Sequence, residues 1–242
     1  MTGAVRRAVI LAAGRGARLG SLPAETPKPL LSVGGEPMLH RILGGLARGG
    51  IEEAAIVTGH LGEQIEAATG DGARWGMAIR YYRQTTLDGT ARALSLAREF
   101  TAGERFFLGW GDIVVGVDNY ARVLELATEA EAVLAVNEVD DPASGGAVYV
   151  DASGRVTRLA EKPAPGTSTT HWNNAGLMVL PPSIWAFVDA LEPSLRGEYE
   201  LPQAVAASIQ AGMATVAAPI EGPWFDAGTP QSLAAARAHF GD

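Results

Sequence analysis

Residues 8–37 read AVILAAGRGARLGSLPAETPKPLLSVGGEP, an apolar run followed by a glycine-rich turn and two cations. The apolar run predicts a short, fully buried strand. Gly14 and Gly16 then allow the backbone to come close enough to touch a phosphate, and Arg18 and Lys28 add positive charge at the same turn. We therefore predict a phosphate-binding loop at the carboxyl end of this strand.

Two common phosphate motifs do not fit this turn. A dinucleotide fingerprint needs a glycine five residues after Gly14, where this chain has Leu19. The Gly-Lys-Ser/Thr ending of the widespread ATP-binding loop is absent. The loop is therefore of another kind.

The same stretch resembles the sugar-1-phosphate nucleotidyltransferases, also called nucleotide-sugar pyrophosphorylases. Their pattern is of the type L-A-G-G-x-G-x-R-L-x-P-L-T…P-K-P-L-L-P-V-x-G-x-P, and Ala13 here replaces one of its glycines. The resemblance implies two catalytic cations, Arg18 on the β- and γ-phosphates of a nucleoside triphosphate and Lys28 on its α-phosphoryl oxygens. It also implies nucleotide contacts at Leu11, Ala13, Gly14 and Gly16.

The composition is that of a chain able to bury a large core. It has 242 residues, 47% of them hydrophobic, with a formal net charge of −8 and no cysteine. The missing cysteine excludes disulfide and thiolate chemistry, and the acidic balance argues against a nucleic acid partner. No run approaches the roughly eighteen apolar residues of a membrane span, and the amino terminus lacks a long apolar region. We expect no membrane association, a cytoplasmic location, and a monomer or homodimer.

Strand-like apolar runs alternate with helical patterns along the first half of the chain. Strands are predicted at 54–58, 78–83 and 105–110, and helices at 63–68 and 90–100. This alternation is typical of a mainly parallel sheet with helices on both faces. Together with the resemblance, it predicts an α/β fold with a Rossmann-like, doubly wound, mostly parallel sheet, similar to glycosyltransferase-A.

The second half of the chain is more mixed. Residues 147–150 and 155–160 flank the turn Asp151-Ala152-Ser153-Gly154 and predict a β-hairpin, and 172–180 predicts a further strand. The resemblance implies that the hairpin belongs to a smaller, sugar-binding lobe.

The sequence has no low-complexity tract and no internal repeat, and only the segment 163–170 has the composition of a mobile loop. We expect one nucleotidyltransferase catalytic domain over 1–242, with a nucleotide-binding half at about 1–112 and a sugar-binding half at about 113–242. A last helix is predicted at 230–240, so no appended C-terminal domain is expected.

A second candidate element, RQTTLDGTARAL at 83–94, places a loop between a predicted strand and an alanine-rich helix. The Gln84 amide offers a donor and an acceptor, which could pair with the adjacent carbonyl and ring N–H of uracil or thymine. The segment is similar to the Q…G-x-A motif of thymidylyl- and uridylyltransferases, with the same offset from Gln84 to Gly89. The resemblance implies nucleotide contacts at Gln84, Gly89 and Thr90. It favours UTP or dTTP, because guanylyltransferases more often carry an acidic residue near the Gln84 position.

Two aspartates lie far apart in the sequence within recognisable motifs. Asp112 follows the buried run that ends at Trp110, and Asp226 lies in Trp224-Phe-Asp-Ala-Gly-Thr-Pro. They resemble the metal ligands of the family's Gly-Asp and W-x-D-x-G-T-P motifs. Two carboxylates with phosphate oxygens suit Mg²⁺, which prefers hard oxygen ligands and keeps several waters. The resemblance therefore implies Mg²⁺ as cofactor, held by Asp112 and Asp226.

The sugar side is carried by motifs that resemble the family's E-K-P, N-A-G and G-E-x-E, here at 161–163, 174–176 and 197–200. The resemblance implies a sugar-phosphate contact by Lys162. It implies sugar contacts at Gly146, Glu161, Asn174 and Glu198. Gly145 stands where the family often has tyrosine, which leaves the identity of the sugar open.

These features predict an enzyme that transfers a nucleotidyl group from a nucleoside triphosphate to a sugar 1-phosphate and releases pyrophosphate. The attacking phosphate is already ionised, so positioning and electrostatics must carry an in-line displacement. Three alternatives stay open. They are a CTP-dependent cytidylyltransferase for phosphocholine or a phosphonate, a GTP-dependent guanylyltransferase, and a non-catalytic nucleotide-binding homologue.

Overall fold

A nine-stranded sheet is built around β1 (Arg7–Ala12), whose last five residues are all buried. The computed structural model describes residues 3–20, 25–194 and 196–241. Parallel to β1 lie β4 (Glu53–Thr58) on one side and β6 (Phe106–Trp110) on the other, and β5 (Ala78–Arg83) pairs in parallel with β4. The carboxyl ends of these four strands therefore meet at one edge of the sheet, where ligands bind in open α/β folds.

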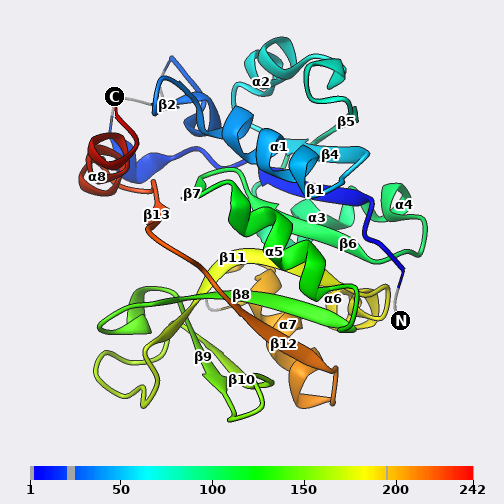
Figure 1. The fold of residues 1–242 in the computed structure, drawn as a ribbon, viewed down its shortest axis with the longest axis vertical. Helices are drawn as coiled ribbons and strands as arrows, with labels where there is room; N and C mark the ends of the chain where they lie inside the picture. The colour runs from blue at the N-terminus through cyan, green and yellow to red at the C-terminus, as the bar shows by residue number, and fades with distance from the viewer. Residues whose placement is uncertain (1–2, 21–24, 195, 242) are drawn as a thin grey trace.

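The second half of the chain extends the same sheet through β11 (Trp172–Leu180). This strand runs antiparallel to β6 and to β8 (Ala132–Glu138), and β12 (Thr215–Pro219) pairs in parallel with β8. The predicted hairpin is β9 (Gly146–Val150) with β10 (Val156–Glu161), and it joins the sheet where Ala147 pairs with Asn173 of β11. Figure 1 shows the hairpin at the far end of the molecule from β1 and β4.

Helices cover both faces of the sheet because the side chains of β1 alternate between them. Ala8 and Ile10 pack into one core cluster and Val9 and Leu11 into the other. The first cluster takes residues from α1 (Met38–Arg48), α2 (Gly62–Thr69) and α5 (Asp118–Leu126). The second takes residues from α3 (Thr90–Ser95), α4 (Arg98–Thr101), α6 (Ile184–Asp189) and α7 (Leu201–Gln210). The α/β, doubly wound, mostly parallel fold that the sequence predicts is confirmed.

A third, smaller hydrophobic cluster packs the last helix against the segment that follows the predicted phosphate loop. Helix α8 (Pro230–Phe240) packs Leu233 and Ala236 against Leu19, Leu31 and Val33, and Figure 1 shows α8 beside β2. The remaining short elements are β2 (Ser32–Val33), β3 (Glu36–Pro37), β7 (Ile113–Val115), β13 (Trp224–Asp226), and the 3₁₀ turns η1 (Ala17–Leu19), η3 (Lys28–Leu30), η4 (Ala73–Trp75) and η5 (Pro142–Ser144). Within the described ranges, no helix has the length and apolarity needed to cross a membrane.

One prediction of secondary structure needs correction. The helix predicted over 90–100 is two helices, α3 and α4, because Ala97 (φ −95°, ψ 10°) leaves helical geometry. The break turns Phe100 into the core beneath β5, where its ring lies 6.5 Å from the ring of Tyr82 in an edge-on arrangement. Burial of Phe100 therefore overrides the helix propensity of the alanine-rich run.

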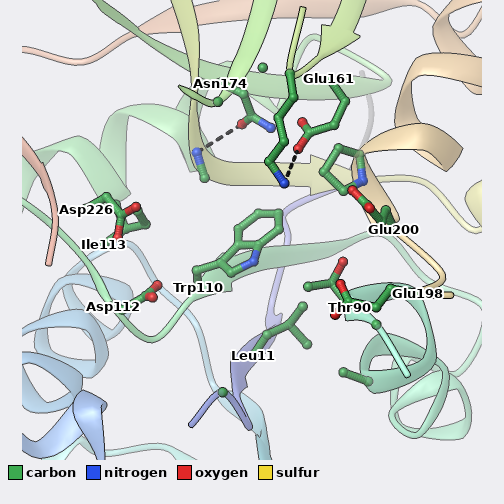
Figure 2. Close-up of a pocket in the computed structure, with 18 of the residues that line it drawn as sticks. Leu11, Thr90, Trp110, Asp112, Ile113, Glu161, Asn174, Glu198, Glu200 and Asp226 are labelled. Atoms are coloured by element: carbon green, nitrogen blue, oxygen red, sulfur yellow. Dashed lines mark hydrogen bonds and ion pairs between the residues drawn. The ribbon is translucent and has the colours of Figure 1, made fainter. Parts of the chain in front are cut away.

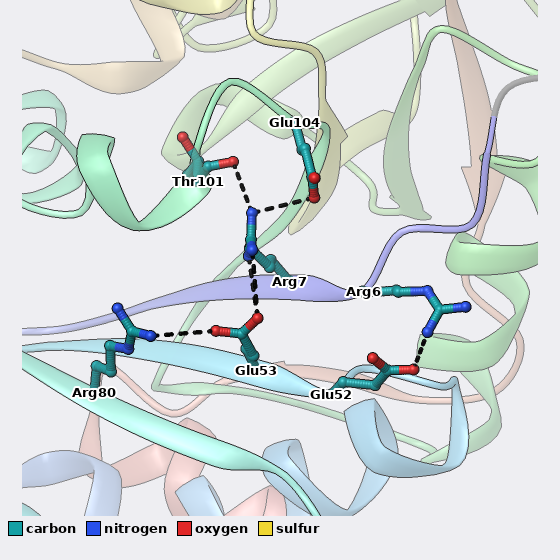
Figure 3. Close-up of polar contacts among 7 residues, drawn as sticks. All are labelled: Arg6, Arg7, Glu52, Glu53, Arg80, Thr101 and Glu104. Atoms are coloured by element: carbon teal, nitrogen blue, oxygen red, sulfur yellow. Dashed lines mark hydrogen bonds and ion pairs between the residues drawn. The ribbon is translucent and has the colours of Figure 1, made fainter.

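Ion pairs link the amino ends of β1, β4 and β5 to one another (Figure 3). Glu53 lies 3.4 Å from Arg7 across the parallel pair and 3.7 Å from Arg80 on β5, and Arg7 also reaches Glu104 at 3.1 Å. These pairs match the register in which Arg7 lies opposite Glu53. The amino edge is thus tied together, and the main cavity opens at the opposite, carboxyl edge.

Candidate active site

A cavity of about 710 Å³ opens at the carboxyl ends of β1 and β6 and extends to the β9–β10 hairpin. In Figure 2 the carboxylates of Asp112 and Asp226 lie on one side of the Trp110 ring, and those of Glu198 and Glu200 lie on the other. Every predicted site residue lines it except Gly16 and Lys28. Those that do are Leu11, Ala13, Gly14, Arg18, Gln84, Gly89, Thr90, Asp112, Gly146, Glu161, Lys162, Asn174, Glu198 and Asp226.

The predicted phosphate loop leaves β1 and turns at Gly16, whose left-handed backbone (φ 65°, ψ 28°) starts the 3₁₀ turn that carries Arg18. The Arg18 side chain is 69% exposed, and its guanidinium lies 3.7 Å from Asp226. Gly228 keeps this space open, since a Cβ there would lie 2.6 Å from Arg18 Nη2 and 2.8 Å from Asp226 Oδ1. A cation beside backbone amides with open space is suited to binding a phosphate.

Lys28 is buried between the two predicted metal ligands, Asp112 and Asp226. Its Nζ is 2.5 Å from Asp112 Oδ2 and 3.5 Å from Asp226 Oδ1, and its side chain is only 7% exposed. Gly111 gives room for the close approach of η3 to the end of β6, since a Cβ there would make tight contacts with Pro29 at 3.3 Å and Ala12 at 3.2 Å. The lysine therefore acts as counter-ion to both carboxylates.

The donor set of Asp112 and Asp226 fits one kind of metal better than another. The two residues come from neighbouring strand ends, because Asp226 of β13 pairs with Ile113 of β7. In the part of the chain that the structure describes, no group of three or more His, Cys, Asp or Glu side chains gathers for a metal. Two carboxylates do not make the closed four-ligand site typical of structural zinc. They do suit Mg²⁺, which completes its shell with waters and substrate phosphates.

The loop after β5 differs in one detail from the sequence-based expectation. Gln84 is buried and lines the cavity, but its amide nitrogen already donates to Asp88 Oδ1 at 3.1 Å and to the Gly89 carbonyl at 3.2 Å. Gln84 therefore cannot offer both a donor and an acceptor to a base without breaking these bonds. At Gly89 (φ +118°) only glycine fits, because a Cβ would lie 2.3 Å from the Tyr199 carbonyl oxygen.

The hairpin and β11 form the other wall of the cavity. Glu161 ends β10, and the next residue, Lys162, has a left-handed backbone (φ 45°) held by a bond from its N–H to the Gly145 carbonyl at 2.7 Å. Lys162 Nζ lies 3.5 Å from Glu161 Oε1. Such a backbone is uncommon for a lysine and fixes the direction in which its side chain leaves the strand.

Two adjacent glycines bring the hairpin close to β11. A Cβ on Gly145 would lie 2.2 Å from Asn173 Oδ1, which accepts a hydrogen bond from the Gly146 N–H at 3.2 Å. A Cβ on Gly146 would lie 3.3 Å from Glu161 Oε2. The tyrosine frequent in similar sequences therefore has no room at position 145 unless Asn173 moves.

Comparison with known proteins agrees with this geometry. A family model described as nucleotidyl transferase matches residues 7–242. The chain belongs to the nucleotidyl transferase family. A low-salt glycan biosynthesis nucleotidyltransferase of Haloferax volcanii is 33% identical over 230 residues, which are 94% of this chain and 64% of that protein. A glucose-1-phosphate thymidylyltransferase of Streptomyces antibioticus is 33% identical over 224 residues, 92% of this chain and 62% of that protein. The chain thus spans less than two thirds of the length of these relatives.

Solved structures show the same fold. A crystal structure of a protein described as a glucose-1-phosphate thymidylyltransferase from Bacillus anthracis, in complex with sucrose, superimposes with a TM-score of 0.87. The identity is 28%, and the match covers 98% of this chain and 95% of that one. The nucleotidyl transferase resemblance seen in the motifs therefore extends over almost the whole chain.

The structure of this member of the nucleotidyl transferase family adds cavity residues that the sequence motifs do not indicate as contacts. Arg196 lines the cavity, lies 2.8 Å from Glu200 Oε1 and reaches Glu198 at 3.6 Å. Asn173 also lines it and is held by a bond from its amide nitrogen to Asn137 Oδ1 at 2.9 Å. For Arg196 the only sequence signal was its place directly before Gly197-Glu198.

The pKa values of two neighbouring carboxyl groups in this cavity are shifted in opposite directions. Burial raises the pKa of Glu161 above its ordinary 4.5; Lys162 opposes this rise and Glu200 adds to it. Burial also acts to raise the pKa of Glu200, but hydrogen bonds from Arg196 and Ser194 outweigh it and lower that pKa below 4.5. This wall of the cavity therefore pairs a carboxyl group at Glu200 that ionises more readily than usual with one at Glu161 that ionises less readily.

Proposed function

We propose that the protein transfers a nucleotidyl group from a nucleoside triphosphate, with UTP or dTTP favoured, to a sugar 1-phosphate. The products are a nucleoside diphosphate sugar and pyrophosphate. The observation that carries the proposal is the cavity that joins the phosphate loop and the Asp112–Asp226 pair to Glu161 and Lys162 on the opposite wall. One cavity with cations on two sides is what two polyanionic substrates require if they are to react with each other.

The proposed roles follow from charge and place. Arg18, exposed at the mouth, would hold the β- and γ-phosphates of the leaving pyrophosphate, and Lys28 would face the α-phosphoryl group. Lys162, 47% exposed on the hairpin, would hold the attacking sugar phosphate. Asp112 and Asp226 would hold Mg²⁺, which supplies charge stabilisation to the transferring phosphoryl group when bound. No general base is needed, because a sugar 1-phosphate is already an anion at neutral pH.

The sugar itself is proposed to lie among Gly146, Glu161, Asn174 and Glu198. Asn174 Oδ1 accepts the Gly176 N–H at 3.0 Å, so the amide nitrogen of Asn174 can donate to a sugar hydroxyl. Carboxylates of Glu161 and Glu198 would accept from other hydroxyls. A cytidylyltransferase for phosphocholine would give these polar side chains no partner, and a non-catalytic homologue would have no use for the paired aspartates.

We also propose that both halves belong to one catalytic domain. The central sheet supports this, since β11 of the second half pairs directly with β6 of the first. The Trp172–Leu180 strand thereby connects the wall that carries Asn174 to the strand that leads into Asp112.

The experiment is a matrix of nucleoside triphosphates against sugar 1-phosphates, with phosphocholine included, scored by pyrophosphate release in Mg²⁺. We expect release with at least one hexose 1-phosphate and with UTP or dTTP. Release with phosphocholine and CTP alone would replace the proposal by the cytidylyltransferase alternative. Nucleotide binding without release in any combination would favour the non-catalytic one.

A further inference from the structure

Asp88 lies beside the predicted nucleotide contacts Gln84 and Gly89 without being one of them. Asp88 lies in the loop between β5 and α3, and its carboxylate oxygen Oδ1 accepts a hydrogen bond from Gln84 Nε2 at 3.1 Å. Gln84 Nε2 also donates to the Gly89 carbonyl at 3.2 Å. The Gln84 backbone is fixed as well, because its N–H donates to the Thr58 carbonyl at 2.8 Å.

The chemistry of these partners decides which way the amide of Gln84 faces. A carboxylate and a backbone carbonyl are acceptors only, so the NH₂ group of Gln84 must point toward them. The carbonyl oxygen Oε1 then occupies the other side of the amide. Since Gln84 lines the cavity, the polar group that it has left for a ligand is an acceptor.

The loop that carries Asp88 is held in place by hydrogen bonds to residues 199–201. The position of Asp88 is therefore set by contacts that do not involve its own side chain. The Asp88 carbonyl accepts the Tyr199 N–H at 2.8 Å. Thr90 Oγ1 accepts the Leu201 N–H at 3.0 Å, and Gly89 between them packs directly on the Tyr199 backbone. These contacts hold the Asp88 backbone next to Gln84, and a substitution of the Asp88 side chain leaves them intact.

We infer that Asp88 is the positioning residue that makes the base pocket selective for a pyrimidine with a ring N–H donor. The inference rests on the proposed function, in which Gln84 meets the base. Uracil and thymine carry N–H at ring position 3, whereas cytosine presents a bare acceptor nitrogen there. A fixed Oε1 acceptor pairs with the first two and faces cytosine acceptor to acceptor, which leaves buried polar groups unpaired.

The variant Asp88→Asn removes the constraint with little change of shape. The introduced amide can turn its NH₂ toward Gln84, so the Gln84 amide can rotate, accept that hydrogen bond and present its own NH₂ to the cavity. That donor pairs with the ring nitrogen of cytosine. The Gly89 carbonyl still favours the original orientation, so we expect relaxed selectivity: the affinity ratio of UMP to CMP should fall by about tenfold.

Binding is measured by calorimetry on the whole chain in Mg²⁺, with UMP against CMP and with dTMP against 5-methyl-dCMP. The members of each pair have the same size and differ only in the groups at ring positions 3 and 4. Asp88→Glu keeps a carboxylate acceptor and should preserve most of the selectivity. Glu63→Gln is the charge control, because Glu63 is an exposed carboxylate that pairs with Arg83, the residue before Gln84, at 2.8 Å.

A ratio that Asp88→Asn leaves unchanged in both pairs, or that Glu63→Gln lowers equally, overturns the inference. So does an unmodified protein that binds both members of each pair equally. These outcomes are separate from failure of the proposed function, because monophosphate binding needs no turnover. If only the acceptor substrate were wrong, pyrophosphate release would fail while the effect of Asp88→Asn on binding remained.

Discussion

The ammonium group of Lys28 lies 2.5 Å from the Asp112 carboxylate, and this contact neutralises a residue proposed to hold Mg²⁺. Asp226 shares the same ammonium at 3.5 Å. The lysine side chain is 7% exposed, whereas the aspartates are 28% and 37% exposed, so the cation is the most buried member of the group. In the proposed function, a nucleotide with its metal would compete with Lys28 for these carboxylates or share them with it.

The first prediction concerns Lys28→Ala, which removes the ammonium shared by Asp112 and Asp226 and leaves Asp226 with the exposed Arg18 guanidinium at 3.7 Å. We expect a loss of about 1–3 kcal/mol in the free energy of unfolding, below the value for a fully buried pair because the carboxylates are partly hydrated. Mg²⁺ should restore more stability to this variant than to the unmodified protein. Urea unfolding in Mg²⁺ and in chelator measures both effects, and Lys162→Ala serves as the exposed-lysine control. Equal losses in Mg²⁺ and chelator would argue against metal binding by these aspartates.

The second prediction concerns the aspartates themselves. Asp112→Asn and Asp226→Asn should each lower kcat by roughly 10²-fold or more, because each would remove a ligand of the ion that stabilises transition-state charge. Pyrophosphate release across a Mg²⁺ titration is the measurement. Asp151→Asn, which alters only an exposed hairpin turn where Asp151 accepts the Ser153 N–H at 2.9 Å, should leave kcat unchanged. Full activity in chelator would remove the metal role.

Much of the fold was predictable because its signals are local. The strands at 78–83 and 172–180 and the helix at 230–240 coincide with β5, β11 and α8, since apolar patterns and flanking turn residues define each one. By contrast, β7 and β13 have three residues each and pair across more than a hundred positions. Segments that short carry no periodicity, so only the tertiary structure reveals that they join Asp112 to Asp226.

The candidate site was predictable as a set of residues but not as a set of contacts. Motifs indicate Lys28 and Asp112 separately, yet their ion pair depends on how closely η3 approaches the end of β6. The acceptor role inferred for Gln84 likewise depends on the position of Asp88, which an isolated motif does not specify. Arg196 was missed because a charged residue in a loop is usually solvated, and its contact with Glu200 appears only in the folded chain.

The third prediction is a pH dependence of stability with opposite signs at two carboxyl groups. The folded pKa of Glu161 is raised above 4.5, so just above pH 4.5 the folded chain still holds a proton that the unfolded chain has released. Its stability contribution is present below 4.5 and is lost as pH rises through the folded pKa. Glu200, with its pKa lowered below 4.5, contributes stability that is present above 4.5 and is lost as pH falls through its folded pKa.

Two substitutions separate these contributions. Glu161→Gln should remove the fall in stability as pH rises above 4.5. Glu200→Gln should remove the gain in stability as pH rises toward 4.5. Urea midpoints between about pH 3 and 7 provide the measurement. If both variants change the profile in the same direction, the opposite environments assigned to the two carboxyl groups are wrong.

The fourth prediction concerns the ion pairs at the amino edge of the sheet (Figure 3). Glu53→Gln removes the carboxylate shared by Arg7 and Arg80 and should cost less than about 1 kcal/mol, with a smaller loss at high salt, because the pairs are partly exposed. KM and kcat should not change, since the cavity opens at the opposite edge. Urea midpoints at low and high salt, compared with the exposed pair variant Glu63→Gln, test the stability part. A changed KM would show that this edge influences the site.

The last prediction separates the two lysines of the cavity region by their effects on kinetics. Lys162 leaves the hairpin with φ 45° and is 47% exposed, so its ammonium can meet an incoming sugar phosphate with little rearrangement. Lys162→Ala should therefore raise the KM for sugar 1-phosphate and leave nucleotide affinity nearly unchanged. Lys28→Ala should instead lower kcat, because its ammonium would face the α-phosphoryl group where charge is rearranged in the transition state. Steady-state kinetics with each substrate varied, and calorimetry with nucleotide alone, distinguish the two. Weakened nucleotide binding by Lys162→Ala with an unchanged sugar phosphate KM would mean that the two roles are reversed or wrong.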